Sequence, residues 1–307
     1  MLIAALALAV LAALLAWPVP LLLGRARWPL RSPAVALILW QSIALAGGLS
    51  MIGALLTFGL APFGPDLLSS FVSFAAYVAG HVPPAPFEVW NLFALWGAFL
   101  LALHLGLTLV LTIVRAERQR RRHAQLVTLL SSPLSATTRL IDSPTPVAYC
   151  LPGALSSITV FSAGLIELLS PVELDAVIAH EKAHVAQRHD IVLVAFRAWH
   201  SALPWFPIAS RAQREVGLLV EMLADDRARR SVADPVLARA IALVGGSPSS
   251  STDIEAARPG DIRSRVLRLA AAPLPAAAEA LVVAAAAALL GVPTALLLAP
   301  GLLGLLG

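Results

Sequence analysis

The sequence predicts a mainly α-helical, polytopic membrane protein with four transmembrane helices and a mixed α+β domain between the third and the fourth helix. Of its 307 residues, 59% are hydrophobic and only 13% are charged, whereas soluble domains contain roughly 45–50% apolar and about 25% charged residues. The apolar residues are also concentrated in blocks, each long enough to cross about 30 Å of hydrocarbon. Composition and patterning together exclude an ordinary soluble protein.

Four segments have the length and hydrophobicity of membrane-spanning helices. They comprise residues 2–23, 34–60, 90–114 and 276–298. The first has no basic residue before its apolar run, which is untypical of a signal peptide, so we expect this helix to be retained. The spans carry almost no charged residues, which disfavours a transporter or a channel.

The basic residues predict how these segments are oriented. Arginines gather between the first two spans, at residues 25–31, and directly after the third, at residues 115–122, whereas the loop 61–89 contains neither Lys nor Arg. Basic clusters beside membrane spans face the cytoplasm. We therefore expect a multi-pass protein of the cell membrane with both termini outside and residues 115–275 in the cytoplasm. Because the arginines adjoin spans, we expect no direct nucleic-acid binding.

A metal-binding motif lies within the predicted cytoplasmic segment. His180, Glu181 and His184 form an H-E-x-x-H pattern, and a capping box formed by Ser170 and Glu173 predicts a helix that contains it. Residues four apart lie on one face of a helix, so both imidazoles can reach one tetrahedral ion. Glu181 is then placed to act on a metal-bound water without being a ligand itself.

A catalytic zinc requires a third protein ligand and one open position. Glu221 and Asp225 are four residues apart on another segment with a helical pattern. We expect Glu221 to bind the metal and Asp225 to accept a hydrogen bond from a ligand imidazole. The alternative is a solvated helix face beside Arg227 and Arg229.

The segment between these motifs, residues 191–210, is strongly apolar. If it crossed the bilayer once, Glu221 would lie on the opposite side of the membrane from His180 and His184. We therefore expect a membrane-dipping hairpin that returns to the cytoplasmic side. Its tryptophans, Trp199 and Trp205, are residues favoured at membrane interfaces.

These motifs resemble those of integral-membrane gluzincin peptidases. The run at residues 174–184 is similar to the active-site helix of the CAAX prenyl proteases, the HtpX proteases and the BlaR/MecR-type peptidases. Trp205-Phe206 ahead of the E-x-x-A-D run at 221–225 is most similar to the BlaR/MecR group, whose W-F-N-P element has Asn where this chain has Pro207. The resemblance covers residues 146–269.

The resemblance implies a zinc-dependent endopeptidase with a zincin-like α+β catalytic domain. In it, Zn2+ is held by His180, His184 and Glu221, Glu181 is the general base, and Asp225 supports a ligand. The chain would divide into a membrane domain (1–114), a cytoplasmic peptidase domain (115–275) and a fourth transmembrane helix with the C-terminus (276–307).

The family also implies a partner, which is a protein substrate at the lipid bilayer. The BlaR/MecR-like role is signal transduction by regulated proteolysis of a cytoplasmic repressor, for example a winged-helix transcriptional repressor. Two alternatives stay open: HtpX-like quality control of membrane proteins, and a catalytically idle membrane signal transducer. The penicillin-binding sensor domain of β-lactam-sensing members is expected to be lacking, because the sequence ends at Gly307. The physiological substrate, the activating signal and the oligomeric state are left open.

One β-type segment precedes the motif helix and is a candidate edge strand for substrate. Main-chain hydrogen bonds at a sheet edge can add a peptide as a further strand. The segment comprises Ser157, Ile158, Thr159, Val160, Phe161 and Ser162. The alternative is an ordinary strand of the core. The group that stabilises the oxyanion is also open among His189, Arg227 and Arg230.

Overall fold

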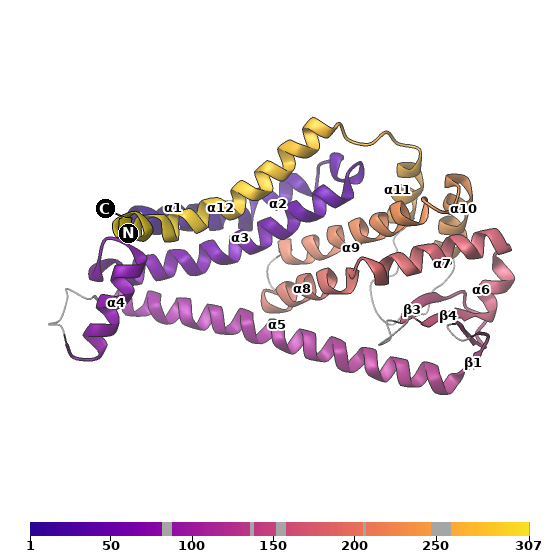
Figure 1. The fold of residues 1–307 in the computed structure, drawn as a ribbon, viewed down its shortest axis with the longest axis horizontal. Coiled ribbons are helices and arrows are strands. Elements are labelled where there is room, and N and C mark those ends of the chain that lie inside the picture. The colour runs from indigo at the N-terminus through magenta and orange to yellow at the C-terminus, as the bar shows by residue number, and fades with distance from the viewer. Residues whose placement is uncertain (82–87, 136–137, 152–157, 205–206, 247–258, 307) are drawn as a thin grey trace.

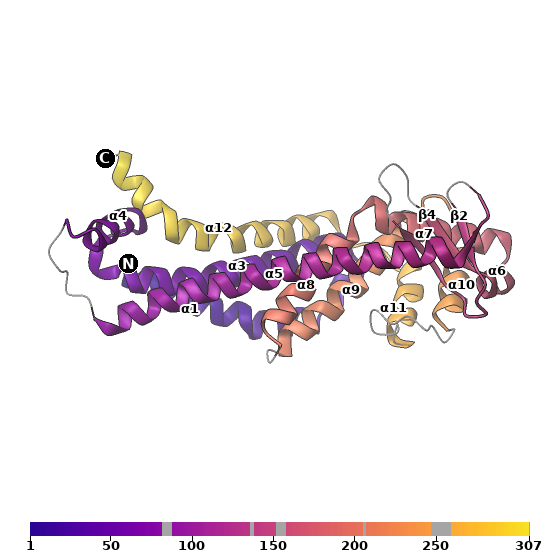
Figure 2. The same ribbon diagram turned by 90° about the horizontal axis from the view of Figure 1, so that it is seen from below.

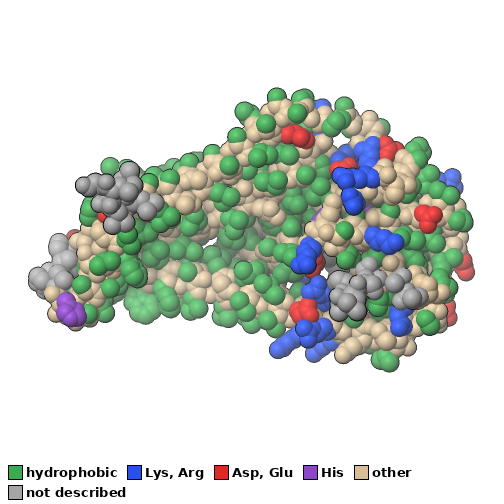
Figure 3. All heavy atoms as spheres, in the orientation of Figure 1, with side chains coloured by type: hydrophobic (Ala, Val, Ile, Leu, Met, Phe, Trp, Pro, Cys, Tyr) green, Lys and Arg blue, Asp and Glu red, His purple; other side chains and the backbone are tan. Residues whose placement is uncertain are grey.

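The computed structural model describes residues 1–81, 88–135, 138–151, 158–204, 207–246 and 259–306. Long helices form one end of the molecule, and a small sheet with shorter helices forms the other (Figure 1). Hydrophobic side chains cover the helical end, whereas Lys and Arg gather around the end that contains the sheet (Figure 3). The predicted mainly helical class with a mixed α+β domain is confirmed.

Four helical segments are long and apolar enough to cross a membrane, as predicted. They are Leu2–Leu23, Pro33–Phe63, Val89–Leu130 and Ala276–Ala299. The first comprises α1 (Leu2–Ala16) and α2 (Pro18–Leu23), and the second contains α3 (Pro33–Leu60). The third is α5 (Val89–Leu130), and the fourth is the first part of α12 (Ala276–Leu306). Helix α3 is central, because it packs against α1, α5 and α12. The short helix α4 (Leu67–Val78) lies in the connection between α3 and α5.

Helix α5 extends well beyond the length of a membrane span. Its 42 residues correspond to about 63 Å, roughly twice the thickness of the hydrocarbon. No proline interrupts it, and it runs from the helical end to the sheet (Figure 2). The predicted span ended at residue 114, whereas the helix continues to Leu130 and leads directly into the first strand.

The sheet has four short strands in the order β1-β2-β4-β3. They are β1 (Ser131–Pro133), β2 (Thr138–Ile141), β3 (Ala148–Leu151) and β4 (Ile158–Ser162). Strand β4 pairs with β2 in parallel and with β3 in antiparallel orientation. Strand β3 lies at the edge of the sheet and contacts the motif helix.

The expectation that residues 158–162 form the substrate edge strand is wrong, because β4 has a neighbouring strand on both sides. Val160 and Phe161 are 1% and 4% exposed, so their β-branched and aromatic character serves the core. Phe161 packs with Leu165 and Val177 in one cluster. Ser157 lies outside the described residues.

Helix α6 (Ala163–Leu168) and helix α7 (Pro171–Ala186) follow β4 directly. The predicted capping box is present: the Ser170 N–H donates to Oε2 of Glu173 over 2.8 Å. Oε1 of the same carboxylate lies 2.8 Å from Nε of Arg239 on α10 (Asp234–Gly245). The start of the motif helix is therefore held both locally and by α10.

Residues 191–210 lie in α8 (His189–Ala202) and at the start of α9 (Pro207–Ala228). The two helices pack against each other, with α8 also on α5 and α9 also on α3 (Figure 1). Phe196 and Val216 share a buried cluster with Trp40 of α3. At the end of α8, the carbonyl oxygen of Ala202 lies 3.0 Å from Nε2 of His104 on α5. Helix α9 therefore runs back toward α7 and carries Glu221 with it.

Candidate metal centre

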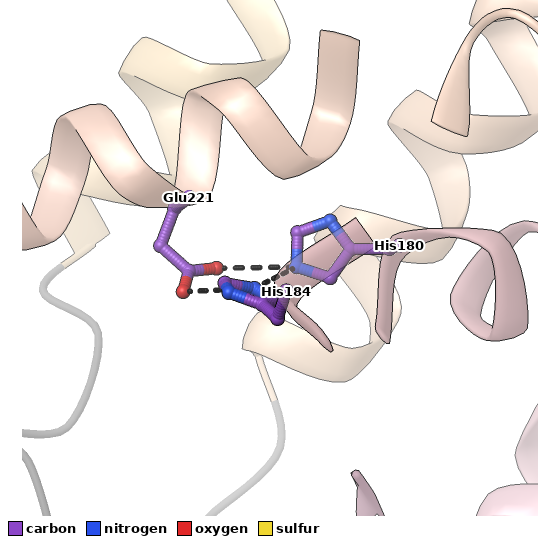
Figure 4. A group of neighbouring side chains, drawn as sticks. All are labelled: His180, His184 and Glu221. Carbon is purple, nitrogen blue, oxygen red and sulfur yellow. Dashed lines mark hydrogen bonds and ion pairs between the residues drawn. The ribbon is translucent and has the colours of Figure 1, made fainter. Parts of the chain in front are cut away.

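Two histidines of α7 form the first half of the site. His180 and His184 lie one helical turn apart, and their Nε2 atoms are 3.1 Å from each other. Both rings point toward the same position, where Glu221 approaches from α9 (Figure 4). The carboxylate of Glu221, more than thirty residues after His184 in the sequence, thus lies beside the two imidazoles.

The three side chains lie close enough together to bind one metal ion, because one ligand atom from each lies within 4.8 Å of the others. Oε2 of Glu221 lies 3.3 Å from Nε2 of His180, and Oε1 lies 3.4 Å from Nε2 of His184. Metal–ligand bonds of about 2.0–2.1 Å at tetrahedral angles place the ligand atoms about 3.3 Å apart. Each nitrogen–oxygen contact, one to each carboxylate oxygen, thus has about the length of a tetrahedral edge. Two imidazoles with one carboxylate are a donor set for zinc.

Asp225 lies behind His180, on the side away from the metal position. Its Oδ1 is 2.9 Å from Nδ1 of His180, and its side chain is only 1% exposed. With Nδ1 carrying its proton toward this carboxylate, Nε2 has a free lone pair for a metal. The structure therefore brings Asp225 to the site in the position that the sequence predicted.

His189 lies beside Nδ1 of His184, as Asp225 lies beside Nδ1 of His180. The two Nδ1 atoms are 3.0 Å apart, and His189 is buried at the start of α8, directly after Arg188 in the left-handed conformation. With Nε2 of His184 directed at the metal, its Nδ1–H donates to Nδ1 of His189. His189 thus contacts a metal ligand, whereas Arg227 and Arg230, the other two oxyanion candidates, are exposed.

Arg265 joins the site from α11 (Pro259–Leu269), and the sequence reasoning missed it. Its guanidinium donates two hydrogen bonds to Asp225, Nε to Oδ2 over 2.8 Å and Nη2 to Oδ1 over 2.7 Å. Its Nη1 lies 3.1 Å from Oε2 of Glu221. Because α11 precedes a span, its arginines have the pattern of a juxtamembrane basic cluster. Only the fold shows that one of them holds two carboxylates of the site.

Glu181 lies next to the ligands without belonging to the set. Burial raises the pKa of its carboxyl to about 7, against the effects of His180 and of a hydrogen bond from the backbone N–H of Cys150 on β3. A carboxyl with a pKa near neutrality can both accept and release a proton at physiological pH. Glu181 therefore has the ionisation behaviour of a general acid–base group.

The charges around the ligands are strongly coupled when no metal is bound. Burial lowers the pKa of His180, but hydrogen bonds to Asp225 and Glu221 outweigh it and raise this pKa to about 10. Burial also lowers the pKa of His184, here to about 4. For Glu221, burial acts to raise the pKa, but His180 and Arg265 hold it well below its usual range. At neutral pH one proton on His180 thus occupies a site built for a cation.

This arrangement defines a class of protein. Two histidines one turn apart, a glutamate beside the first of them and a third ligand from another helix form the active site of a zincin-type metallopeptidase. The domain that carries it is attached to four apolar helices long enough to span a membrane.

Residues 114–229 match the model of peptidase family M48. The chain therefore contains an M48 domain and is a zinc metallopeptidase with candidate transmembrane helices. The match does not assign it to the BlaR/MecR-type group. No curated protein and no solved structure matches the chain significantly. Arg265 lies outside the matched segment.

Replacing Arg265 by Gln should weaken zinc binding by about 10–100-fold, the usual effect of losing a residue that supports metal ligands. Asp225 and Glu221 would lose their shared cation, and both carboxylates would be free to rotate. Competition with a chelator measures the zinc affinity. Arg263→Gln is the matched control, because Arg263 is exposed on the same helix. Equal affinities of the two variants would contradict the role of Arg265.

Zinc binding at pH 8 should release a proton from His180. A pKa of about 10 keeps this ring protonated at pH 8, and ligation requires it to lose the proton from Nε2. The Asp225→Asn variant removes one of the two groups that raise this pKa and should release fewer protons. Calorimetric titration in two buffers of different ionisation enthalpy measures the number of protons released per zinc ion bound.

The control for this titration is Asp226→Asn, because Asp226 pairs with Arg268 and not with His180. Wild type and the control should release the same number of protons. If Asp225→Asn also matched them, His180 would not be the source.

Proposed function

We propose that this protein is a membrane-embedded zinc endopeptidase that hydrolyses peptide bonds of protein substrates at the membrane surface. The observation that carries the proposal is the group of His180, His184 and Glu221, whose ligand atoms lie within 4.8 Å of one another, beside the half-buried Glu181. A structural zinc site would have a fourth protein ligand in place of an open position. Here the neighbouring acid has a pKa suited to proton transfer.

Each residue of the site has a role in this proposal. His180, His184 and Glu221 hold zinc, which supplies Lewis-acid activation of water and of the scissile carbonyl. Glu181 accepts a proton from the attacking water and passes it to the nitrogen of the leaving amine, so that hydrolysis consumes no net proton. Asp225, itself held by Arg265, orients the ring of His180.

We propose that the substrate binds along the edge strand β3, and not along β4, which is an inner strand of the sheet. The Cys150 N–H hydrogen-bonds to Glu181 and therefore points away from the partner strand β4. Backbone groups alternate in direction along an antiparallel pair, so Ala148, two residues earlier, points the same way. An extended peptide that adds to this edge by main-chain hydrogen bonds would lie directly beside the general base.

The proposed orientation places the catalytic domain in the cytoplasm and both termini outside. Two arginine clusters support this orientation. One, at residues 25–31, follows α2, and the other, at residues 115–122, lies in the part of α5 that extends toward the domain.

Cysteine labelling checks this orientation in intact cells. In a Cys150→Ala background, His81→Cys should react with a membrane-impermeant maleimide added from outside, whereas Arg230→Cys should react only after lysis. Both positions are exposed, so access to the reagent and not burial decides the result. The reverse pattern would overturn the orientation.

The pathway that we propose is regulated proteolysis of a cytoplasmic repressor, for example a winged-helix transcriptional repressor as in a BlaR/MecR-like role. What supports it is the similarity of Trp205-Phe206-Pro207 and of the E-x-x-A-D run to that group, together with three spans before the domain and one after it. Trp205 and Phe206 lie outside the described residues. An HtpX-like role in quality control is the second candidate, and its substrates would be damaged membrane proteins.

Glu181→Gln should lower the hydrolysis of an unfolded protein such as β-casein by at least about 100-fold, because the general base is lost. Its zinc content should equal that of wild type, since Glu181 is no ligand. His184→Ala should lose both zinc and activity, and Glu167→Gln, an exposed acid on α6, should change neither. Full activity of Glu181→Gln would contradict the assignment of the base.

The same inactive variant separates the two pathways. A substrate that accumulates uncleaved in cells carrying Glu181→Gln would be a repressor under the first pathway and misfolded membrane proteins under the second. Comparison of protein abundance with wild-type cells distinguishes them.

A further inference from the structure

An apolar cavity of about 350 Å³ lies between the first two spans and the α8–α9 hairpin. Small residues such as Ala12, Ala16 and Gly47 form part of its wall, and the rings of Trp40 and Trp199 form another part. A dry cavity of about 150 Å³ is enough to bind benzene, and ligand pockets begin at about 300 Å³. The space is therefore large enough for several methylene groups of a chain.

The cavity lies at the depth of lipid acyl chains. The contact between Ala202 and His104 places the end of α8 about 22 Å along α5 from Val89. With Val89, the first residue of α5, taken as one boundary of a hydrocarbon layer of about 30 Å, this point lies about 8 Å inside the boundary nearer the catalytic domain. Helices α1 and α3, which form the opposite wall, belong to the first two candidate spans.

Arg211 lies next to residues that line this cavity. Its neighbours on α9, Ala209 and Ala212, line the cavity, and its side chain passes Gly24 at the end of α2, where a Cβ would lie 3.0 Å from Cδ of Arg211. Its Nη1 atom is buried and has no hydrogen-bond partner among the described residues. A bound ligand that accepts a hydrogen bond from this atom would remove the free-energy cost of a buried unpaired donor.

The charges around Arg211 favour an anion. Arg25 follows Gly24 directly, and Arg214 lies one turn further along α9. Glu215 is the acid that Arg211 affects electrostatically, but it makes no hydrogen bond to Nη1. A phosphodiester attached to a hydrocarbon chain combines the two properties that this site presents, a cationic rim and an apolar interior at membrane depth.

We propose that this site binds an anionic phospholipid, with one acyl chain in the cavity and a phosphate oxygen accepting a hydrogen bond from Nη1 of Arg211. The lipid occupies the space between α3 and α9 and packs against both. Helix α9 also carries Glu221, so the lipid supports the helix that supplies the third metal ligand. The site is independent of the peptidase chemistry, and its test requires no substrate.

The test uses the full-length protein, purified in detergent and delipidated. Palmitoyl-oleoyl phosphatidylglycerol and the corresponding phosphatidylcholine are titrated separately, and native mass spectrometry counts the bound lipids. Arg211→Gln should weaken binding of phosphatidylglycerol by about tenfold, through loss of one charge-assisted hydrogen bond. Arg118→Gln is the matched control, because it removes the same charge from an exposed position on α5, which does not line the cavity.

A second variant tests the apolar part. The side chain of Gly47→Leu would project into the cavity, and the first atom added meets only an ordinary contact, 3.8 Å from Cβ of Leu15. It should weaken binding of both lipids, and an unchanged melting temperature shows that it folds.

Three results would overturn the proposal. The first is equal phosphatidylglycerol binding by Arg211→Gln and Arg118→Gln, which would show general attraction of anionic lipid to a basic surface. The second is undiminished binding by folded Gly47→Leu, which would place the chain elsewhere. The third is displacement of the lipid by inorganic phosphate at equal concentration, which would show a site for a free anion.

Discussion

The metal centre depends on one constraint. An apolar segment separates Glu221 from His180 and His184 in the sequence, and the fold must bring Glu221 back beside them. The α8–α9 hairpin meets this constraint, because α8 leads away from α7 and α9 leads back. The hairpin is buried against α3 and α5 and not against the sheet, and Phe196 and Val216 share their core with Trp40 of a span. The position of a metal ligand is thus determined by packing within the membrane-spanning end of the protein. Helix α9 thus connects the packing of these helices to Glu221.

Charge compensation is the second requirement of the site. Glu221 and Asp225 are acids brought close together, and burying the carboxylate of Asp225 without a partner would cost several kcal/mol. Arg265 contacts both carboxylates, and His180 lies between them, so that each of these two carboxylates has an opposite charge in contact. This network explains why an arginine from a helix beyond the matched M48 segment belongs to the site. It also explains why Glu181, which has no such cation in hydrogen-bond contact, keeps a pKa near neutrality.

The membrane-spanning helices and the catalytic domain are connected structurally at two places. Helix α5 passes without a break from the membrane to β1, and the hairpin carries the catalytic helix α9 into the cluster of spans. Between the hairpin and the first two spans the small side chains leave a cavity with a cationic rim. A lipid in that cavity would connect the composition of the bilayer to the helix that bears Glu221. Regulation through the spans therefore has a physical route that needs no additional domain.

The sequence by itself determined the features that depend on local pattern. These are the four apolar spans, the capped helix with His180, Glu181 and His184, and the acids of α9, because hydrophobic length and helical spacing are encoded in neighbouring residues. Tertiary structure decided which strand lies at the sheet edge, since the β-branched pattern of β4 is shared by core and edge strands, and its two neighbours place it inside. It also decided the partners of His184 and Asp225. His189 and Arg265 come from other helices, and contacts between distant segments leave no periodic signal in the chain.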